Sequence, residues 1–188
     1  MKHYIKLFES WKKHSLKLSD RFNEEEAEIL GFLMHDKAHV LGRTGHGNDP
    51  TLASIFNKVK GERYRGTLWR GIYREEKELY ETLYLTREAA TVTRYLSFSE
   101  SRETAILFSK LTNILIELTD SKGLLNYHQW IREIAEQDLK SGGDEYYYRD
   151  LMETADVELE HIMNIGTRIQ VIAKRQEDDL TIYTIRQA

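Results

Sequence analysis

The sequence contains no cysteine and a single proline, Pro50, among its 188 residues. The absence of cysteine excludes disulfide bonds and thiolate-bound metal sites. No apolar run approaches the roughly 20 residues that a membrane-spanning helix needs. The basic N-terminal stretch lacks the apolar core and cleavage site of a secretory signal. We therefore expect neither a membrane span nor a signal peptide, and no proline-rich linker marks a domain boundary.

Composition and charge are ordinary for a globular protein. Hydrophobic residues make up 40% of the chain, charged residues make up 31%, and the formal net charge is −4. This is enough apolar material for one core. The negative charge argues against a broad nucleic-acid-binding surface, although it is compatible with a local basic groove. We expect a single domain over 1–188, with a helical region over 1–62 and a β-rich core over 63–188.

Hydrophobic periodicity predicts helices first and mostly strands later, which indicates an α+β fold. Asn23 and Glu26 have the spacing of a capping box at the start of a helical region, Asn23–Lys60, which a glycine-rich loop over 42–49 interrupts. Helices are predicted over Thr51–Val59, Arg74–Leu85, Ser101–Leu111 and Tyr127–Lys140. Strands are predicted over Thr67–Tyr73, Asn113–Leu118, Val157–Met163, Thr167–Ala173 and Leu180–Ile185.

Two glutamates in the segment VELEHIM, Glu158 and Glu160, are separated by one leucine. The surrounding apolar residues favour a strand over Val157–Met163. On a strand, residues two apart point to the same face, so both carboxylates would project together. The alternative is a strand with one solvated face, which is the usual meaning of alternating charge.

Two earlier segments contain polar residues that suggest a site. Arg70 lies in the apolar segment TLWRGIY and needs an anionic partner, either a phosphate or carboxylate of a ligand or a structural salt bridge. Ser97 and Ser99 occupy alternate positions in YLSFSES, directly before a predicted helix. The alternative for them is helix capping by Ser99 or Ser101, with Glu103 as the capping partner.

In this order, LWRG, LSFS and ELE resemble the Arg-Ser-Glu signature of mono-ADP-ribosyltransferases of the cholera-toxin-like class. The resemblance extends from about Thr67 to the end of the chain. It is greatest to the small accessory ADP-ribosyltransferases of T4-like bacteriophages, in the layout YYYRDLMETADVELEHIMNIGTRIQVI and the segment LTIYTI. It implies an ADP-ribosyltransferase fold with two packed antiparallel β-sheets, N-terminal and flanking helices, and an NAD cleft between the sheets.

The transfer of ADP-ribose from NAD to arginine can use two acidic side chains, one for the donor and one for the acceptor. Breaking the nicotinamide–ribose bond produces an oxocarbenium-like centre, as in glycoside hydrolysis. The resemblance assigns Glu160 to the ribose 2′-hydroxyl, where its carboxylate stabilises that centre. An arginine acceptor is protonated, so a second carboxylate must help to remove its proton, and Glu158 is assigned this role. Within the family, Glu-x-Glu accompanies arginine acceptors, whereas Gln-x-Glu accompanies asparagine or other residues.

The remaining site residues follow from the resemblance. Arg70 is expected to contact the NAD diphosphate or adjoining ribose, and Gly71 to offer its backbone to the nicotinamide carboxamide. Ser97 is expected to hold Glu160 by a hydrogen bond, and Ser99 to support the nicotinamide side of the pocket. Phe108 is expected to stack there, with a core position on its helix as the alternative.

A target-recognition role is expected for the Gly142–Asp156 loop, which contains Tyr146, Tyr147 and Tyr148. Several relatives have an aromatic residue just before the glutamate pair, whereas this chain has its aromatics further back. The alternative is a tyrosine-rich segment that packs on the sheet.

Other sites are not supported by motifs. The segment GRTGHG lacks the Gly-Lys-Ser/Thr of a P-loop, and no GxGxxG opens a βαβ unit. The histidines show no HExxH spacing, so we expect no metal. His161 is expected to point away from Glu160 on the strand.

The resulting hypothesis is a monomeric NAD-dependent transferase that modifies arginine on host proteins, in the transcription or translation machinery, during phage infection. It would act in the cytoplasm of the host bacterium, without a membrane. The alternatives are an NAD glycohydrolase, a transferase that uses NAD-linked RNA as donor, or a binding module that has lost the chemistry. Intact Arg70, Ser97 and Glu160 argue against the last.

Overall fold

The computed structural model describes residues 22–23, 25–26, 29–30, 50–140, 142 and 144–188. The helices are α3 (Pro50–Val59), the short 3-10 helix η3 (Arg74–Glu76), α4 (Lys77–Thr86), α5 (Arg102–Phe108), α6 (Tyr127–Lys140) and α7 (Glu145–Glu158). The strands are β1 (Arg63–Gly71), β2 (Ala89–Thr91), β3 (Leu96–Ser99), β4 (Ile114–Lys122), β5 (Leu125–Asn126), β6 (Glu160–Met163), β7 (Arg168–Glu177) and β8 (Leu180–Gln187). The fold is therefore α+β, as the sequence predicts.

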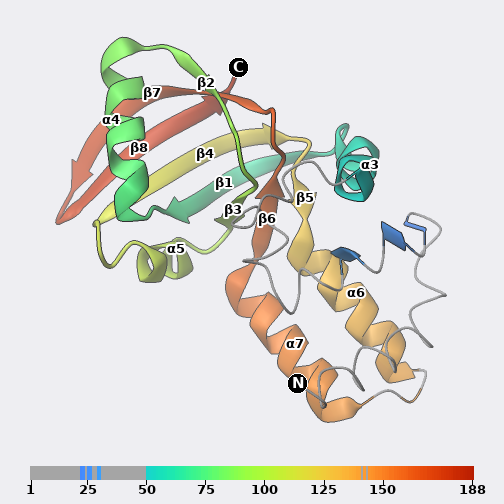
Figure 1. Ribbon diagram of the computed structural model, residues 1–188. Helices are drawn as coiled ribbons and strands as arrows, with labels where there is room; N and C mark the ends of the chain where they lie inside the picture. The colour runs from blue at the N-terminus through green and yellow to red at the C-terminus, as the bar shows by residue number, and fades with distance from the viewer. Residues whose placement is uncertain (1–21, 24, 27–28, 31–49, 141, 143) are drawn as a thin grey trace.

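The strands form one hydrogen-bonded ladder in the order β2-β7-β8-β4-β1-β3-β6-β5. All pairs are antiparallel except β4 with β8, which is parallel. Within the described residues, β1 and β3 share one register pair, Trp69 with Ser99. The ladder is narrow at this point, and its two parts, β2 to β1 and β3 to β5, diverge from it (Figure 1). The two sheets predicted from the sequence are thus joined by this link.

Two large apolar cores and one small cluster stabilise the described part of the chain. One lies between α4 and the larger part of the sheet and contains Tyr80, Ile116 and Tyr183, each at most 1% exposed. The other joins α3, α6 and α7 to β5 and β6, and includes Ile55 and Ile162. Burying each such side chain contributes about 1.5–3 kcal/mol. The site described below lies where the two parts of the sheet meet.

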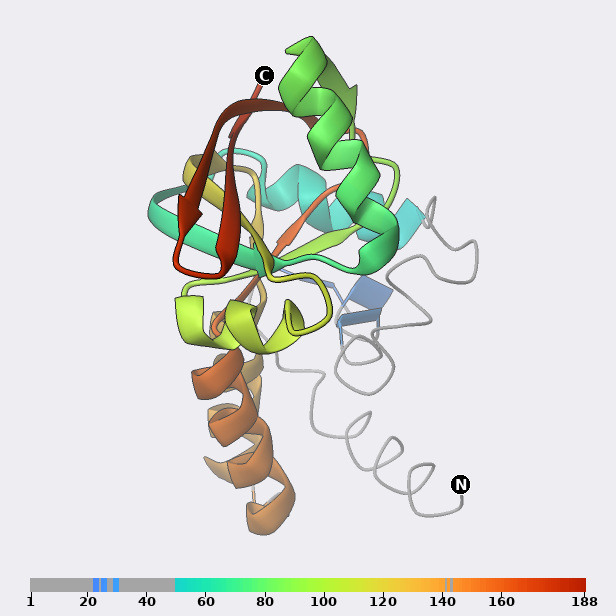
Figure 2. The same cartoon turned by 90° about the vertical axis from the view of Figure 1, so that its left-hand side faces the viewer.

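Helices α6 and α7 pack side by side and extend away from the sheet (Figures 1 and 2). Helix α6 has the predicted bounds. Helix α7 replaces the predicted Gly142–Asp156 loop, because the Asp144 carboxylate caps its first turn by accepting from the backbone N–H groups of Tyr146 and Tyr147. The loop prediction was therefore wrong.

The predicted capping box is present at the described part of the N-terminal region. The backbone N–H of Glu26 donates to Asn23 Oδ1 at 2.9 Å, and the N–H of Asn23 donates to Glu26 Oε2 at 2.8 Å. Most of 1–49, including the glycine-rich loop, lies outside the described residues. No helix within the described residues has the length and apolar character that crossing a membrane requires.

Candidate active site

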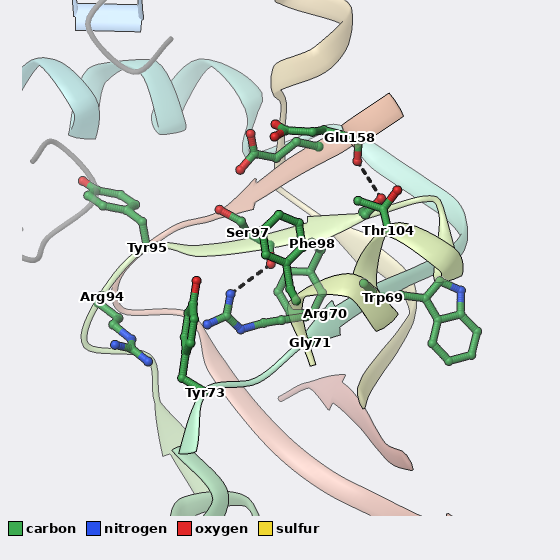
Figure 3. Close-up of a pocket in the computed structure, with 14 residues that line it drawn as sticks. Trp69, Arg70, Gly71, Tyr73, Arg94, Tyr95, Ser97, Phe98, Thr104 and Glu158 are labelled. Carbon is green, nitrogen blue, oxygen red and sulfur yellow. Dashed lines mark hydrogen bonds between the residues drawn. The ribbon is translucent and has the colours of Figure 1, made fainter. Parts of the chain in front are cut away.

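A pocket of about 340 Å³ opens at the narrow link between β1 and β3 (Figure 3). Its walls come from β1, β3, α5 and the junction of α7 with β6. Every residue that the sequence predicts for catalysis or NAD binding lines it: Arg70, Gly71, Ser97, Ser99, Phe108, Glu158 and Glu160. Ligand pockets in proteins typically occupy about 300–1,000 Å³, so this one accommodates at least part of a dinucleotide.

The two glutamates reach the pocket by a different route from the predicted strand. Glu158 is the last residue of α7, Leu159 adopts a left-handed conformation with φ 44° and ψ 49°, and Glu160 is the first residue of β6. The strand prediction over Val157–Met163 was therefore wrong in its first three residues. A helix end followed by one left-handed residue, rather than the alternation of a strand, brings both carboxylates to one pocket.

The carbonyl groups at the end of α7 are held by the β3–α5 segment. The Ser99 hydroxyl donates to the carbonyl of Glu158 at 2.6 Å, and the Thr104 hydroxyl donates to that of Val157 at 2.9 Å. The backbone N–H of Glu100 donates to the carbonyl of Leu159 at 3.1 Å. Terminal helix carbonyls lack partners within their own helix, so these bonds fix the backbone that carries both glutamates.

The alternative role in helix capping applies to Ser101. Its hydroxyl accepts from the backbone N–H of Thr104 at 3.1 Å and donates to Glu103 at 3.3 Å. Ser99 contacts both the end of α7 and the start of α5, because its hydroxyl also accepts from the backbone N–H of Ser101 at 3.0 Å. Ser97 contributes its backbone carbonyl, which accepts from Arg70, while its hydrogen bond to Glu160 stays a prediction.

Arg70 lines the pocket, with its side chain 11% exposed. Its Nη1 donates to the carbonyl of Ser97 at 3.1 Å, and its Nη2 lies 2.9 and 3.1 Å from the two carboxylate oxygens of Glu76 (Figure 3 draws the Ser97 bond). The Nε is buried and has no hydrogen-bond partner within the described residues. Arg70 therefore offers a ligand its positive charge at the pocket wall, whereas Nε itself is enclosed by the protein.

Glu76 is a residue that the sequence analysis missed. It also accepts from Arg94 Nη2 at 2.7 Å and from the backbone N–H of Tyr73 at 3.0 Å. Burial would raise its pKa, but the charge of Arg70 and these hydrogen bonds outweigh burial and hold the pKa below the ordinary value of 4.5. The one signal in the sequence was the need of Arg70 for an anionic partner.

Gly71 is required by the approach of α5. A Cβ at this position would lie 2.3 Å from the carbonyl oxygen of Ala105 and 2.6 Å from the backbone nitrogen of Ser109. These are backbone atoms, so they cannot move aside as a flexible side chain does. The packing of α5 on β1 accounts for glycine here, and the contact with a nicotinamide carboxamide stays a prediction.

Aromatic side chains form the exposed rim of the pocket. Phe108 is 54% exposed, so the alternative of a core position on its helix was wrong. Tyr73 is 39% exposed and also lines the pocket. Trp69, on β1, lies with its ring 5.2 Å from the guanidinium carbon of Arg102. Exposed rings beside a pocket offer stacking surfaces for a planar ligand.

Tyr146, Tyr147 and Tyr148 lie in the first turn of α7, at the opposite end of this helix from Glu158. At about 1.5 Å per residue, the helix separates them from the glutamates by roughly 15–18 Å. Tyr146 is 89% exposed and Tyr148 is buried. The structure does not bring these tyrosines to the pocket.

Comparisons with known proteins identify the fold. No protein-family model matches the chain, and no curated protein sequence matches it significantly. Exoenzyme S from Pseudomonas aeruginosa, solved with human 14-3-3 protein beta and carba-NAD, is 13% identical with a TM-score of 0.59, over 98% of this chain and 88% of that one. The C3 exoenzyme from Clostridium limosum is 14% identical with a TM-score of 0.55, over 98% of this chain and 90% of that one.

A third solved structure is ADP-ribosyltransferase Vis in complex with agmatine. It is 14% identical with a TM-score of 0.56, over 100% of this chain and 85% of that one. Identities this low establish architecture, and the architecture is shared over almost the whole chain. The chain therefore has the ADP-ribosyltransferase fold that the sequence resemblance predicts.

Proposed function

We propose that this protein is an NAD-dependent mono-ADP-ribosyltransferase that modifies arginine side chains. The observation that carries the proposal is the joint presence of Glu158 and Glu160 in one pocket with Arg70 and Ser97. The fold is that of enzymes solved with an NAD analogue or a guanidinium compound. The exposed rings provide a stacking surface, and Arg70, which lines the pocket, provides the cationic side chain that a dinucleotide requires.

On the donor side, Glu160 is assigned to the ribose next to nicotinamide. Glu160 is 7% exposed, and a carboxylate that is shielded from water interacts strongly with a developing positive charge. Its backbone pairs with Ser99, whose hydroxyl also fixes the end of α7. Such fixed positioning favours the transition state over the ground state.

On the acceptor side, Glu158 is assigned to the incoming guanidinium. It lies at a helix end and is more exposed than Glu160, which suits a group that meets a second substrate from solvent. Vis has been solved with agmatine, whose guanidinium group is that of arginine. This supports an arginine acceptor over asparagine.

The biological setting follows from the sequence resemblance to phage enzymes. We infer that the targets are host proteins of transcription or translation, in the cytoplasm of an infected bacterium. Free NAD is the proposed donor, with NAD-linked RNA as the alternative.

The proposal is tested by incubating a bacterial lysate with the protein and NAD labelled in the adenine portion. We expect labelled protein bands, with ADP-ribose located on arginine by mass spectrometry. Release of nicotinamide without labelled protein would instead identify an NAD glycohydrolase. Repeating the assay with 5′-NAD-RNA distinguishes the two donors, because the transferred adduct then contains RNA.

A further inference from the structure

Three side chains with metal-ligating atoms converge beside the candidate active site. Glu100 directly follows β3, His128 lies in the first turn of α6, and His161 lies in β6. Their ligating atoms all lie within 4.8 Å of one another. We propose that these three residues bind a divalent transition-metal ion, with Zn²⁺ as the preferred metal.

The distances between the ligating atoms suit a tetrahedral ion. His161 Nε2 lies 2.7 Å and His128 Nε2 lies 3.8 Å from Glu100 Oε1. Zinc binds such atoms at about 2.0–2.2 Å in tetrahedral geometry, which separates neighbouring ligand atoms by about 3.3 Å. The two distances to Glu100 lie on either side of this value, and all three ligating atoms lie within 4.8 Å of one another, so the side chains must move closer together to enclose the ion.

The hydrogen bond of His128 orients its ring toward the carboxylate. Its Nδ1 lies 3.3 Å from the backbone carbonyl oxygen of Glu160, which can only accept, so Nδ1 is assigned as the donor. In the neutral ring, Nε2 then presents a lone pair to Glu100. A cation between these two electron-rich atoms offsets their repulsion. Metal-bound histidines generally donate their other ring N–H to a carbonyl or carboxylate in this way.

The other two ligands are also prepared by their surroundings. The Tyr64 phenol donates a hydrogen bond to the Glu100 carboxylate and so helps to orient it. The His161 ring is held between the rings of Tyr64 and His128, at centroid distances of 4.7 and 5.3 Å.

The ligand set and its accessibility define the metal. Two imidazoles and one carboxylate suit zinc and other transition metals, whereas magnesium and calcium prefer oxygen ligands. The Glu100 side chain is 29% exposed and that of His161 is 3% exposed. This exposure gives the ion a route from solvent and leaves the fourth position to water. No local motif revealed the site, because its residues come from three separate segments.

The experiment uses the chain of 188 residues, freed of metal with a chelator and titrated calorimetrically with Zn²⁺, and in parallel with Mg²⁺. We expect one saturable Zn²⁺ equivalent, and a visible absorption spectrum typical of tetrahedral geometry when Co²⁺ is used. Glu100→Gln and His128→Gln should each weaken Zn²⁺ binding by at least about tenfold. Both residues are partly exposed, so these variants should fold, as circular dichroism will verify.

The matched control is a double variant, His35→Gln with His39→Gln, at positions outside the described residues. It should bind Zn²⁺ as the wild type does. The proposal is overturned if the wild type shows no saturable Zn²⁺ binding, if only the His35/His39 variant loses it, or if Mg²⁺ binds equally well. The readout is metal binding without NAD, so its failure and the failure of the proposed function are distinguishable.

Discussion

The guanidinium of Arg70, which lines the pocket, and the carboxylate of Glu76 form a buried ion pair, with Nη2 2.9 and 3.1 Å from the two oxygens. Arg94 approaches the same carboxylate at 2.7 Å. Glu76 therefore positions two cationic side chains that line the pocket. The structural salt bridge that the sequence left open for Arg70 is present.

Glu76→Gln should destabilise the protein by about 3 kcal/mol at pH 7, because the Arg70 charge is left buried without its partner. The free energy of unfolding is measured by chemical denaturation. Glu75→Gln, at an exposed neighbouring position, is the control and should change stability little. Equal stability of the two variants would contradict the role of Glu76.

The same pair predicts a pH dependence. The pKa of Glu76 is lowered in the folded state, so its stabilisation is present above the ordinary value of 4.5 and is lost as pH falls through the lower folded value. The stability difference between wild type and Glu76→Gln should therefore be constant near neutral pH and shrink below about pH 4.5. A difference that persists unchanged into this acidic range would show that ionisation of Glu76 does not matter.

Arg70→Lys keeps the positive charge but loses the planar guanidinium group, which can donate two parallel hydrogen bonds to one anion. Calorimetry should find NAD binding weaker by about 1–3 kcal/mol, the scale of hydrogen bonds to charged groups. The control is Arg102→Lys, because Arg102 pairs with Glu177 and does not line the pocket. If a folded Arg70→Lys protein binds NAD as tightly as the control, Arg70 serves the structure alone.

Gly71→Ala should destabilise the fold by about 1–3 kcal/mol or more, because the new methyl group meets the backbone of α5. Gly61→Ala is a matched control, since a Cβ there has no neighbour within 4 Å. Thermal denaturation of the two variants should separate them clearly. If both melt like the wild type, α5 does not pack as described.

The elements that the sequence predicted best have strong local signals. Helix α6 has helical periodicity throughout, and the β4 and β8 segments are rich in β-branched residues. The site residues were found because their order along the chain resembles a known signature. That resemblance does not depend on correct secondary structure, which is why Glu158 was placed in the site although its segment was predicted as strand.

The errors have physical causes. The alternation in VELE is too short to distinguish a strand from a helix end followed by a left-handed residue, and the helical signal of Asp144 as N-cap was overlooked. The pairing of Arg70 with Glu76, and the convergence of His128 with His161, depend on tertiary contacts that no local pattern records. Phe108 has the sequence environment of a core residue but lies at a pocket rim.

Glu158→Gln separates the acceptor step from the donor step. It removes the proton acceptor while keeping the shape, and water needs less activation than a guanidinium as a nucleophile. Arginine modification should nearly disappear while substantial NAD hydrolysis persists, measured in one tube as labelled protein and free nicotinamide. A parallel fall of both activities would assign Glu158 to the donor step or to the structure, and unchanged activities would make it a solvated residue.

The central claim is that Glu160 stabilises the positive charge that develops as NAD loses nicotinamide. The most direct measurement is the rate of nicotinamide release by wild type, Glu160→Gln and the exposed control Glu153→Gln, with folding verified by circular dichroism. Loss of one electrostatic contact to a developing charge lowers the rate by about a hundredfold or more. We predict such a fall for Glu160→Gln and a wild-type rate for Glu153→Gln. Near-normal nicotinamide release by a folded Glu160→Gln protein would contradict the account.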